Sequence, residues 1–175
     1  MKISVFLDGA NFFFMQKDSG WFADPKKILK YIEQEGTIID AFYYIGRDTP
    51  PDARQKSYLD ALPSMGYTLI TKQIKTIYDT KSGKTKQKAN LDIEIVLDMF
   101  NTIEHYDKAV LISGDGDFER ALTSLRIREK KFNVIATDNF IARELLNVAG
   151  RHYISLNSIK EKIEKNSLFN PCRLD

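Results

Sequence analysis

Cysteine and histidine are nearly absent from this chain of 175 residues. The single cysteine, Cys172, lies close to the C-terminal end, so a disulfide framework and a cysteine-based zinc site are both excluded. His105 follows a predicted helix and His152 opens a predicted edge strand, so we expect structural or solvated roles for both histidines. A reducing cytoplasm is the simplest compartment for such a chain.

Long apolar runs and a strong net charge are missing as well. The apolar stretch from Ile3 to Leu7 is too short for a secretory signal, and no later run approaches the ~18 residues that a membrane-spanning helix needs. Lys and Arg number 26 against 24 Asp and Glu, so the net charge of +2 neither favours nor excludes nucleic acid. With 43% hydrophobic residues, we expect a soluble cytoplasmic protein that makes no membrane contact.

Apolar segments rich in β-favouring residues alternate with amphipathic segments along the chain. This pattern predicts strands over residues 3–7, 37–45, 67–70, 109–112, 132–137 and 152–156. It predicts helices over residues 25–35, 52–65, 89–104, 118–129, 140–148 and 158–165. Such alternation is typical of βαβ units, so we expect an α/β fold with a mainly parallel sheet in one domain over residues 1–165. Residues 166–175 are expected to form a loose tail.

Aspartates follow two of the predicted strands. Asp8 ends the first strand, and Asp115 and Asp117 follow the strand over residues 109–112. Ligands bind at the carboxyl ends of strands in open α/β sheets, and two carboxylates there repel each other unless a cation or a proton lies between them. One of the pair is expected to cap the following helix, and we predict that lesser role for Asp117. Capping explains one aspartate but not both.

A third chain segment contributes another acidic residue. A helical wheel of residues 89–104 places Asp92 on the apolar side together with Val96 and Met99. A carboxylate that points inward from the first turn of a helix has a desolvation cost unless it has partners. Asp92 is therefore either a hydrated N-terminal charge that the helix dipole favours or a metal ligand.

If the strands over residues 3–7 and 109–112 are neighbours, the topology brings four carboxylates to one sheet edge: Asp8, Asp92, Asp115 and Asp117. Hard oxygen ligands of this kind suit Mg²⁺ or Mn²⁺, which often meet substrate phosphates directly. Such an ion lowers the pKa of water and offsets charge on phosphorus. Without a catalytic histidine or an activated cysteine, metal-activated water is the simplest nucleophile, and the arrangement suggests phosphodiester hydrolysis.

The segment from Lys72 to Lys88 is the one basic concentration in the chain, because its six lysines face a single acidic residue, Asp79. One interpretation is a flexible arm that attracts a phosphate backbone and offers an aromatic ring for stacking. The other is a solvated hairpin tip. The first interpretation assigns RNA binding to Lys81, Lys84, Lys86, Lys88 and Tyr78.

Three motifs resemble the NYN domain family of the LabA-like type, a branch of the PIN-like nucleases. They are Phe-Leu-Asp-Gly-Ala-Asn at residues 6–11, Lys-Ala-Asn-Leu-Asp at 88–92 and Leu-Ile-Ser-Gly-Asp-Gly-Asp-Phe at 111–118. The resemblance implies a three-layer αβα sandwich and an endoribonuclease that depends on Mg²⁺ or Mn²⁺ and acts on RNA, which we expect to be single-stranded. It makes the four aspartates the acidic cluster, gives Asn11 and Ser113 supporting hydrogen-bonding roles, and suits Lys88 to a phosphate.

The chain departs from the family pattern in two places. The usual Lys-Gly-Val-Asp is one residue longer here, and Asp98, which matches a family acidic position, falls on the polar face of the wheel. The extra RNA-binding module of some members has no counterpart, so substrate capture would rest on the basic segment, a homodimer or a protein partner.

Two other classes of function stay open. A non-catalytic RNA-binding or regulatory module would keep the same fold, although the presence of all four aspartates favours the enzyme. A phosphatase that uses Asp8 as a covalent nucleophile is less favoured, because position 10 holds Ala10 and not a second aspartate.

Overall fold

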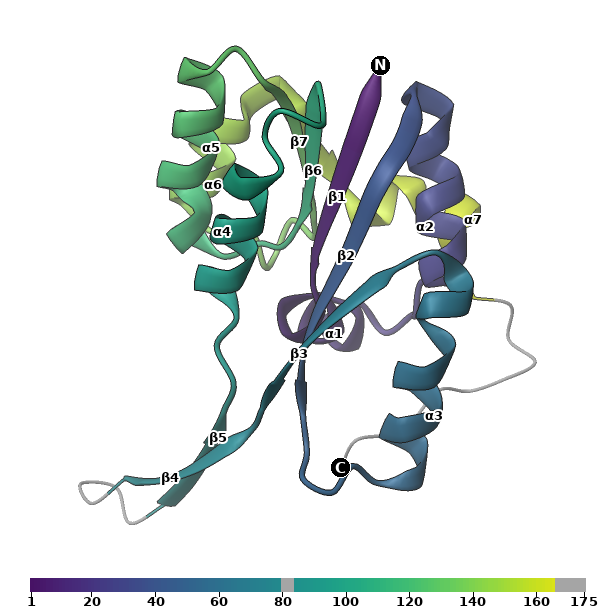
Figure 1. The fold of residues 1–175 in the computed structure, drawn as a ribbon, viewed down its shortest axis with the longest axis vertical. Helices are drawn as coiled ribbons and strands as arrows, with labels where there is room; N and C mark the ends of the chain where they lie inside the picture. Colours follow the sequence, from purple (N-terminus) through teal and green to yellow (C-terminus); the bar gives the residue numbers. More distant parts are fainter. Residues whose placement is uncertain (80–83, 166–175) are drawn as a thin grey trace.

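A computed structural model describes residues 1–79 and 84–165, with the backbone alone for residues 76–79 and 84–88. Its central sheet has six strands in the order β3-β2-β1-β6-β7-β8, and all neighbouring strands are parallel (Figure 1). The strands are β1 Lys2–Asp8, β2 Thr37–Arg47, β3 Thr68–Gln73, β6 Lys108–Ile112, β7 Lys131–Ala136 and β8 Tyr153–Ser155. The predicted α/β fold with a mainly parallel sheet is confirmed.

Helices cover both faces of this sheet (Figure 1). They are α1 Gly9–Ser19, α2 Pro25–Ile32, α3 Ala53–Ala61, α4 Asp92–Asn101, α5 Glu119–Ile127, α6 Arg143–Ala149 and α7 Lys160–Ile163. Short 3-10 helices lie at η1 Glu33–Glu35, η2 Pro63–Met65, η3 Gly116–Phe118, η4 Gly150–His152 and η5 Leu156–Ile159. Because both faces are covered, β1 and β6 are buried almost throughout, which explains their apolar runs.

Two hydrophobic cores lie between the sheet and the helices, one on each face of the sheet. The first packs α1, α2, α3 and α7 against one face of the sheet, through side chains such as Phe12, Ile28 and Ile163. The second packs α4, α5 and α6 against the other face, through side chains such as Ile95 and Leu122. The molecule is therefore a three-layer αβα sandwich, as the resemblance implied.

The order of the strands reverses between β1 and β6. The chain first builds β1, β2 and β3 in one direction, then returns to place β6 beside β1 and continues outward with β7 and β8. Leu7 of β1 pairs with Ile112 of β6, so both strands end at the same level. The crevice outside such a reversal is where open α/β sheets bind ligands.

An antiparallel hairpin is inserted between β3 and α4. Its strands are β4 Lys75–Asp79 and β5 Lys84–Lys88, which pair only with each other and project away from the sandwich (Figure 1). The basic segment therefore includes a hairpin, and which of its two interpretations holds, RNA-binding arm or solvated tip, stays open. Lys81 and the tail over residues 166–175, with Cys172, lie outside the described residues.

Several helices begin later than predicted, and the delay is three residues at α4 and at α6. Helix α4 begins at Asp92 because residues 89–91 bring the chain back from the hairpin, and residues 116–118 form η3 before α5. Helix α6 begins at Arg143 because a turn precedes it, in which the N–H groups of Phe140 and Ile141 donate to the Thr137 carbonyl oxygen.

Candidate metal centre

Asp8 lies at the carboxyl end of β1 and is only 9% exposed. Its carboxylate caps α1 by accepting a hydrogen bond from the Asn11 backbone N–H at 3.1 Å, and it accepts a second from Ser113 Oγ at 3.1 Å. Burial raises the pKa of Asp8; the two hydrogen bonds lower it, and the charges of Asp92 and Asp115 raise it further. Asp8 therefore lies close enough to Asp92 and Asp115 for their negative charges to disfavour its ionised form.

Three other carboxylates come together beside Asp8. Asp92, Asp115 and Asp117 each offer one oxygen, and these atoms all lie within 4.8 Å of one another. Asp92 is the first residue of α4, whereas Asp115 and Asp117 belong to the turn after β6. Asp92 and Asp115 are half-buried and Asp117 is exposed. Carboxylates this close repel one another, and a divalent cation between them would relieve the repulsion.

Asp8 is not a member of this three-carboxylate group but is connected to it through Ser113. The buried Ser113 hydroxyl donates to Asp8 and accepts a hydrogen bond from the Asp115 backbone N–H at 3.2 Å. Asn11 Oδ1 accepts a hydrogen bond from the Gly114 N–H at 2.9 Å. Both residues join the end of β1 to the end of β6, and their supporting role in the site stays a prediction.

The helix cap is Asp115, so the prediction that Asp117 serves mainly as the cap is wrong. Asp115 has extended backbone and precedes η3, and its Oδ1 accepts a hydrogen bond from the Asp117 N–H at 3.0 Å. The chain turns immediately after Gly114, which is two residues earlier than it would turn if Asp117 were the cap. Asp117 consequently lies inside the turn, where its carboxylate joins the group.

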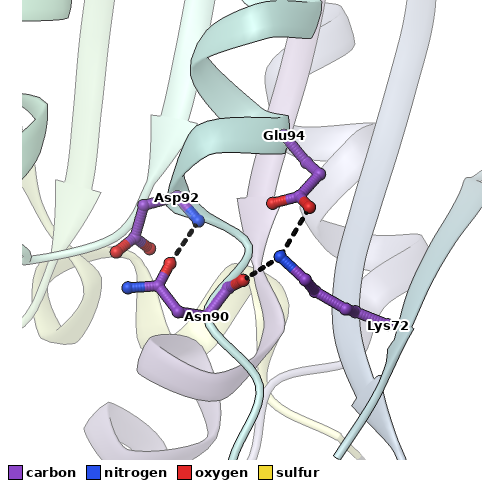
Figure 2. Close-up of polar contacts among 4 residues, drawn as sticks. All are labelled: Lys72, Asn90, Asp92 and Glu94. Atoms are coloured by element: carbon purple, nitrogen blue, oxygen red, sulfur yellow. Dashed lines mark hydrogen bonds and ion pairs between the residues drawn. The ribbon is translucent and has the colours of Figure 1, made fainter.

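The start of α4 is held from two sides (Figure 2). Asn90 Oδ1 accepts a hydrogen bond from the Asp92 N–H at 2.8 Å. Lys72 Nζ, from β3, donates to the Asn90 carbonyl oxygen at 2.9 Å and to Glu94 Oε1 at 2.7 Å. The hydrogen bond from Lys72 is the main reason why the pKa of Glu94 lies below its usual value. Sequence reasoning missed this arrangement, because Lys72 and Glu94 are 22 residues apart and no local pattern pairs them.

Asp98 lies outside the three-carboxylate group. It is half-buried and accepts a hydrogen bond at 3.0 Å from the hydroxyl of Tyr44, a fully buried residue of β2. Burial and the neighbouring Asp98 charge raise the pKa of Tyr44. Asp98, which the helical wheel placed on the polar face of α4, is therefore partly buried, because its carboxylate contacts Tyr44 of β2.

The predicted RNA-binding residues remain untested. Tyr78 lies on β4, and Lys84, Lys86 and Lys88 lie on β5, but the structure describes only their backbone, and Lys81 lies outside the described residues. Within residues 1–79 and 84–165, no helix has the length and apolar character needed to cross a membrane.

Comparisons with known proteins address the family and the fold of this chain. The sequence pattern of the NYN domain family matches residues 2–157. A curated relative, "Low amplitude and bright protein LabA" from Synechococcus elongatus, is 47% identical over 173 residues, which cover 97% of this chain and 91% of the relative. A crystal structure of a protein of unknown function from Vibrio parahaemolyticus superposes with a TM-score of 0.77, covering 94% of this chain and 96% of the other. At 20% identity, that likeness concerns the fold alone.

Proposed function

The chain belongs to the NYN domain family, whose fold is nuclease-like, and on this premise we propose that it is a metal-dependent endoribonuclease acting on single-stranded RNA. The observation that carries the proposal is the group of three carboxylates at the point where the strand order reverses, with Asp8 buried beside it. Helix caps and surface charges alone would not need three acidic oxygens within 4.8 Å of one another.

The donor set fits a hard divalent cation. Asp92, Asp115 and Asp117 supply only oxygen ligands, as Mg²⁺ and Mn²⁺ prefer, and the exposed Asp117 leaves one side of the group open to substrate. These three residues would hold the ion, and Asp8 would add charge from the β1 side. When bound, a divalent ion supplies Lewis acidity that activates water and offsets charge on the phosphate.

The remaining residues hold the carboxylates in place. Ser113 fixes the orientation of Asp8 and, through the Asp115 backbone N–H, the start of the turn that carries the group. Asn11 holds the same turn at Gly114. Positioning of this kind counts in catalysis because small displacements of reacting groups are costly.

The hairpin is the proposed means of substrate capture. Its second strand, β5, ends at Lys88 and leads within four residues to Asp92, so a strand bound along the hairpin would lie close to the carboxylates. The lysines proposed for this role, with Tyr78 for stacking, are Lys81, Lys84, Lys86 and Lys88.

Cleavage of a fluorescent single-stranded RNA by the purified chain, with Mn²⁺ and with chelator, tests the proposal. Asp92→Asn and Asp115→Asn should each lower the rate by more than the ~10–100-fold that loss of an outer-shell partner costs. Asp60→Asn, which removes an exposed carboxylate from α3, is the matched control and should cleave like wild type. RNA binding without cleavage in any divalent metal would instead identify a non-catalytic RNA-binding or regulatory module.

A further inference from the structure

A lysine closes the base of the hairpin. The hairpin of β4 and β5 is joined to the sandwich through its two roots, Ile74 and Ala89; Lys72 lies in β3 two residues before the first root, and Asn90 directly follows the second. The 2.9 Å hydrogen bond from Lys72 Nζ to the Asn90 carbonyl oxygen joins the two points where the hairpin leaves the sandwich. We call Lys72, Asn90 and Glu94, with the two hydrogen bonds that Lys72 donates, the lysine clasp.

The hairpin roots are packed against the end of β2. A Cβ placed on Gly46 would lie 2.9 Å from Ile74 Cγ1 and 2.9 Å from Ala89 Cβ, so both roots touch the sheet at this glycine. The Ile74 N–H also donates to the Arg47 carbonyl oxygen at 2.9 Å. The base of the hairpin is therefore fixed to the sandwich, and Lys72 projects from that fixed base.

The same ammonium group reaches the helix that carries Asp92. Lys72 binds Asn90 before Asp92 and Glu94 after it, and Asn90 Oδ1 accepts the Asp92 N–H (Figure 2). In Figure 2, Asp92 and Lys72 approach Asn90 from opposite sides. Glu94 Oε2 is buried and has no hydrogen-bond partner among the described residues, so Lys72 is the main group that compensates this carboxylate.

We propose that Lys72 is a positioning residue that fixes Asp92 for cation binding and ties the hairpin to the carboxylate site. By holding Asn90 and Glu94, which lie two residues before and two residues after Asp92, it sets the start of α4 against the turn that carries Asp115. The cation-binding part stands on the carboxylate geometry alone, whereas the link to substrate rests on the proposed function.

Mn²⁺ affinity tests the lysine clasp because two explanations predict opposite changes in that affinity when Lys72 is replaced. Lys72 is a positive charge near a cation site, so its removal should strengthen Mn²⁺ binding if charge alone matters. If Lys72 positions Asp92, Lys72→Met should weaken Mn²⁺ binding by the ~10–100-fold that is typical for outer-shell partners of metal ligands.

The experiment is calorimetric titration of Mn²⁺ alone into the purified chain, with metal-free melting curves to show that each variant is folded. Lys75→Met removes an exposed charge from the same hairpin root and should leave the affinity unchanged or slightly higher. Lys72→Arg keeps a donor for both oxygens and should restore most of the affinity.

Each result has one meaning. Wild-type or tighter Mn²⁺ binding by Lys72→Met overturns the lysine clasp even if the protein cleaves RNA. Weakened binding by Lys72→Met, recovered in Lys72→Arg, supports the clasp even if no RNA is cleaved, in which case only the proposed function fails. Failure of the wild-type chain to bind Mn²⁺ overturns both.

Discussion

Gly114 is the point at which the carboxylate turn is most tightly packed, so its substitution gives the most quantitative prediction. A Cβ on Gly114 would lie 2.5 Å from the Phe140 carbonyl oxygen, 3.0 Å from the carbonyl carbon and 3.1 Å from Ile141 Cα. These are backbone atoms of the turn before α6, which a rotamer change cannot move. The Gly114 carbonyl oxygen also accepts a hydrogen bond from the Ala142 N–H at 2.8 Å.

Gly114→Ala should therefore lower the free energy of unfolding by the ~1–3 kcal/mol that overpacking of a well-packed core costs. For a chain of this size, this corresponds to a drop in melting temperature of roughly 2–12 °C. Because Asp115 is the next residue, the same displacement should weaken Mn²⁺ binding. Urea denaturation and calorimetric titration measure the two effects.

Gly116→Ala is the matched control. Its Cβ would lie 3.1 Å from Ala142 Cβ and 3.6 Å from the flexible end of the Glu144 side chain, so the expected cost is under about 1 kcal/mol. If Gly114→Ala is as stable as wild type and binds Mn²⁺ equally well, the turn is not held by this packing and the reasoning is refuted.

Three further predictions concern the charged residues. Burial raises the pKa of Asp8, so the free energy of unfolding falls as the pH rises from the ordinary pKa of an aspartate to the raised value. Asp8→Asn should lack this fall, and in metal-free buffer at neutral pH it should melt at or above the wild-type temperature. The same variant should lose Mn²⁺-dependent cleavage. Neutralising Lys81, Lys84 and Lys86 together should weaken RNA binding and flatten its salt dependence; an unaltered slope in filter-binding assays would exclude these lysines from phosphate contact. Asp98→Asn, which keeps an acceptor for Tyr44, should cleave RNA and bind Mn²⁺ like wild type, and a loss of metal affinity would place Asp98 in the site.

The sheet could be predicted from the sequence because its signals are local. Ile3 to Leu7 and Ala109 to Ile112 are continuous apolar runs, and strands covered on both faces need such runs. Carboxylates at the ends of β1 and β6 could be predicted to converge once the two strands were taken as neighbours, and the pairing of Leu7 with Ile112 confirms that premise.

The details of the site could not be predicted because they depend on contacts between distant segments. The choice of Asp115 over Asp117 as the cap depends on where the chain turns after Gly114, which is set by packing against Phe140. The environment of Asp98 depends on Tyr44, which is 54 residues away. Local spacing carries no information about either contact.

The most direct test of the carboxylate site is a Mn²⁺ soak of crystals of this protein, with data collected at a wavelength where manganese scatters anomalously. The proposed centre predicts an anomalous peak at coordination distance from carboxylate oxygens of Asp92, Asp115 and Asp117, on the side facing Asp8. No peak at high Mn²⁺ concentration, or a peak bound only by other residues, would contradict it.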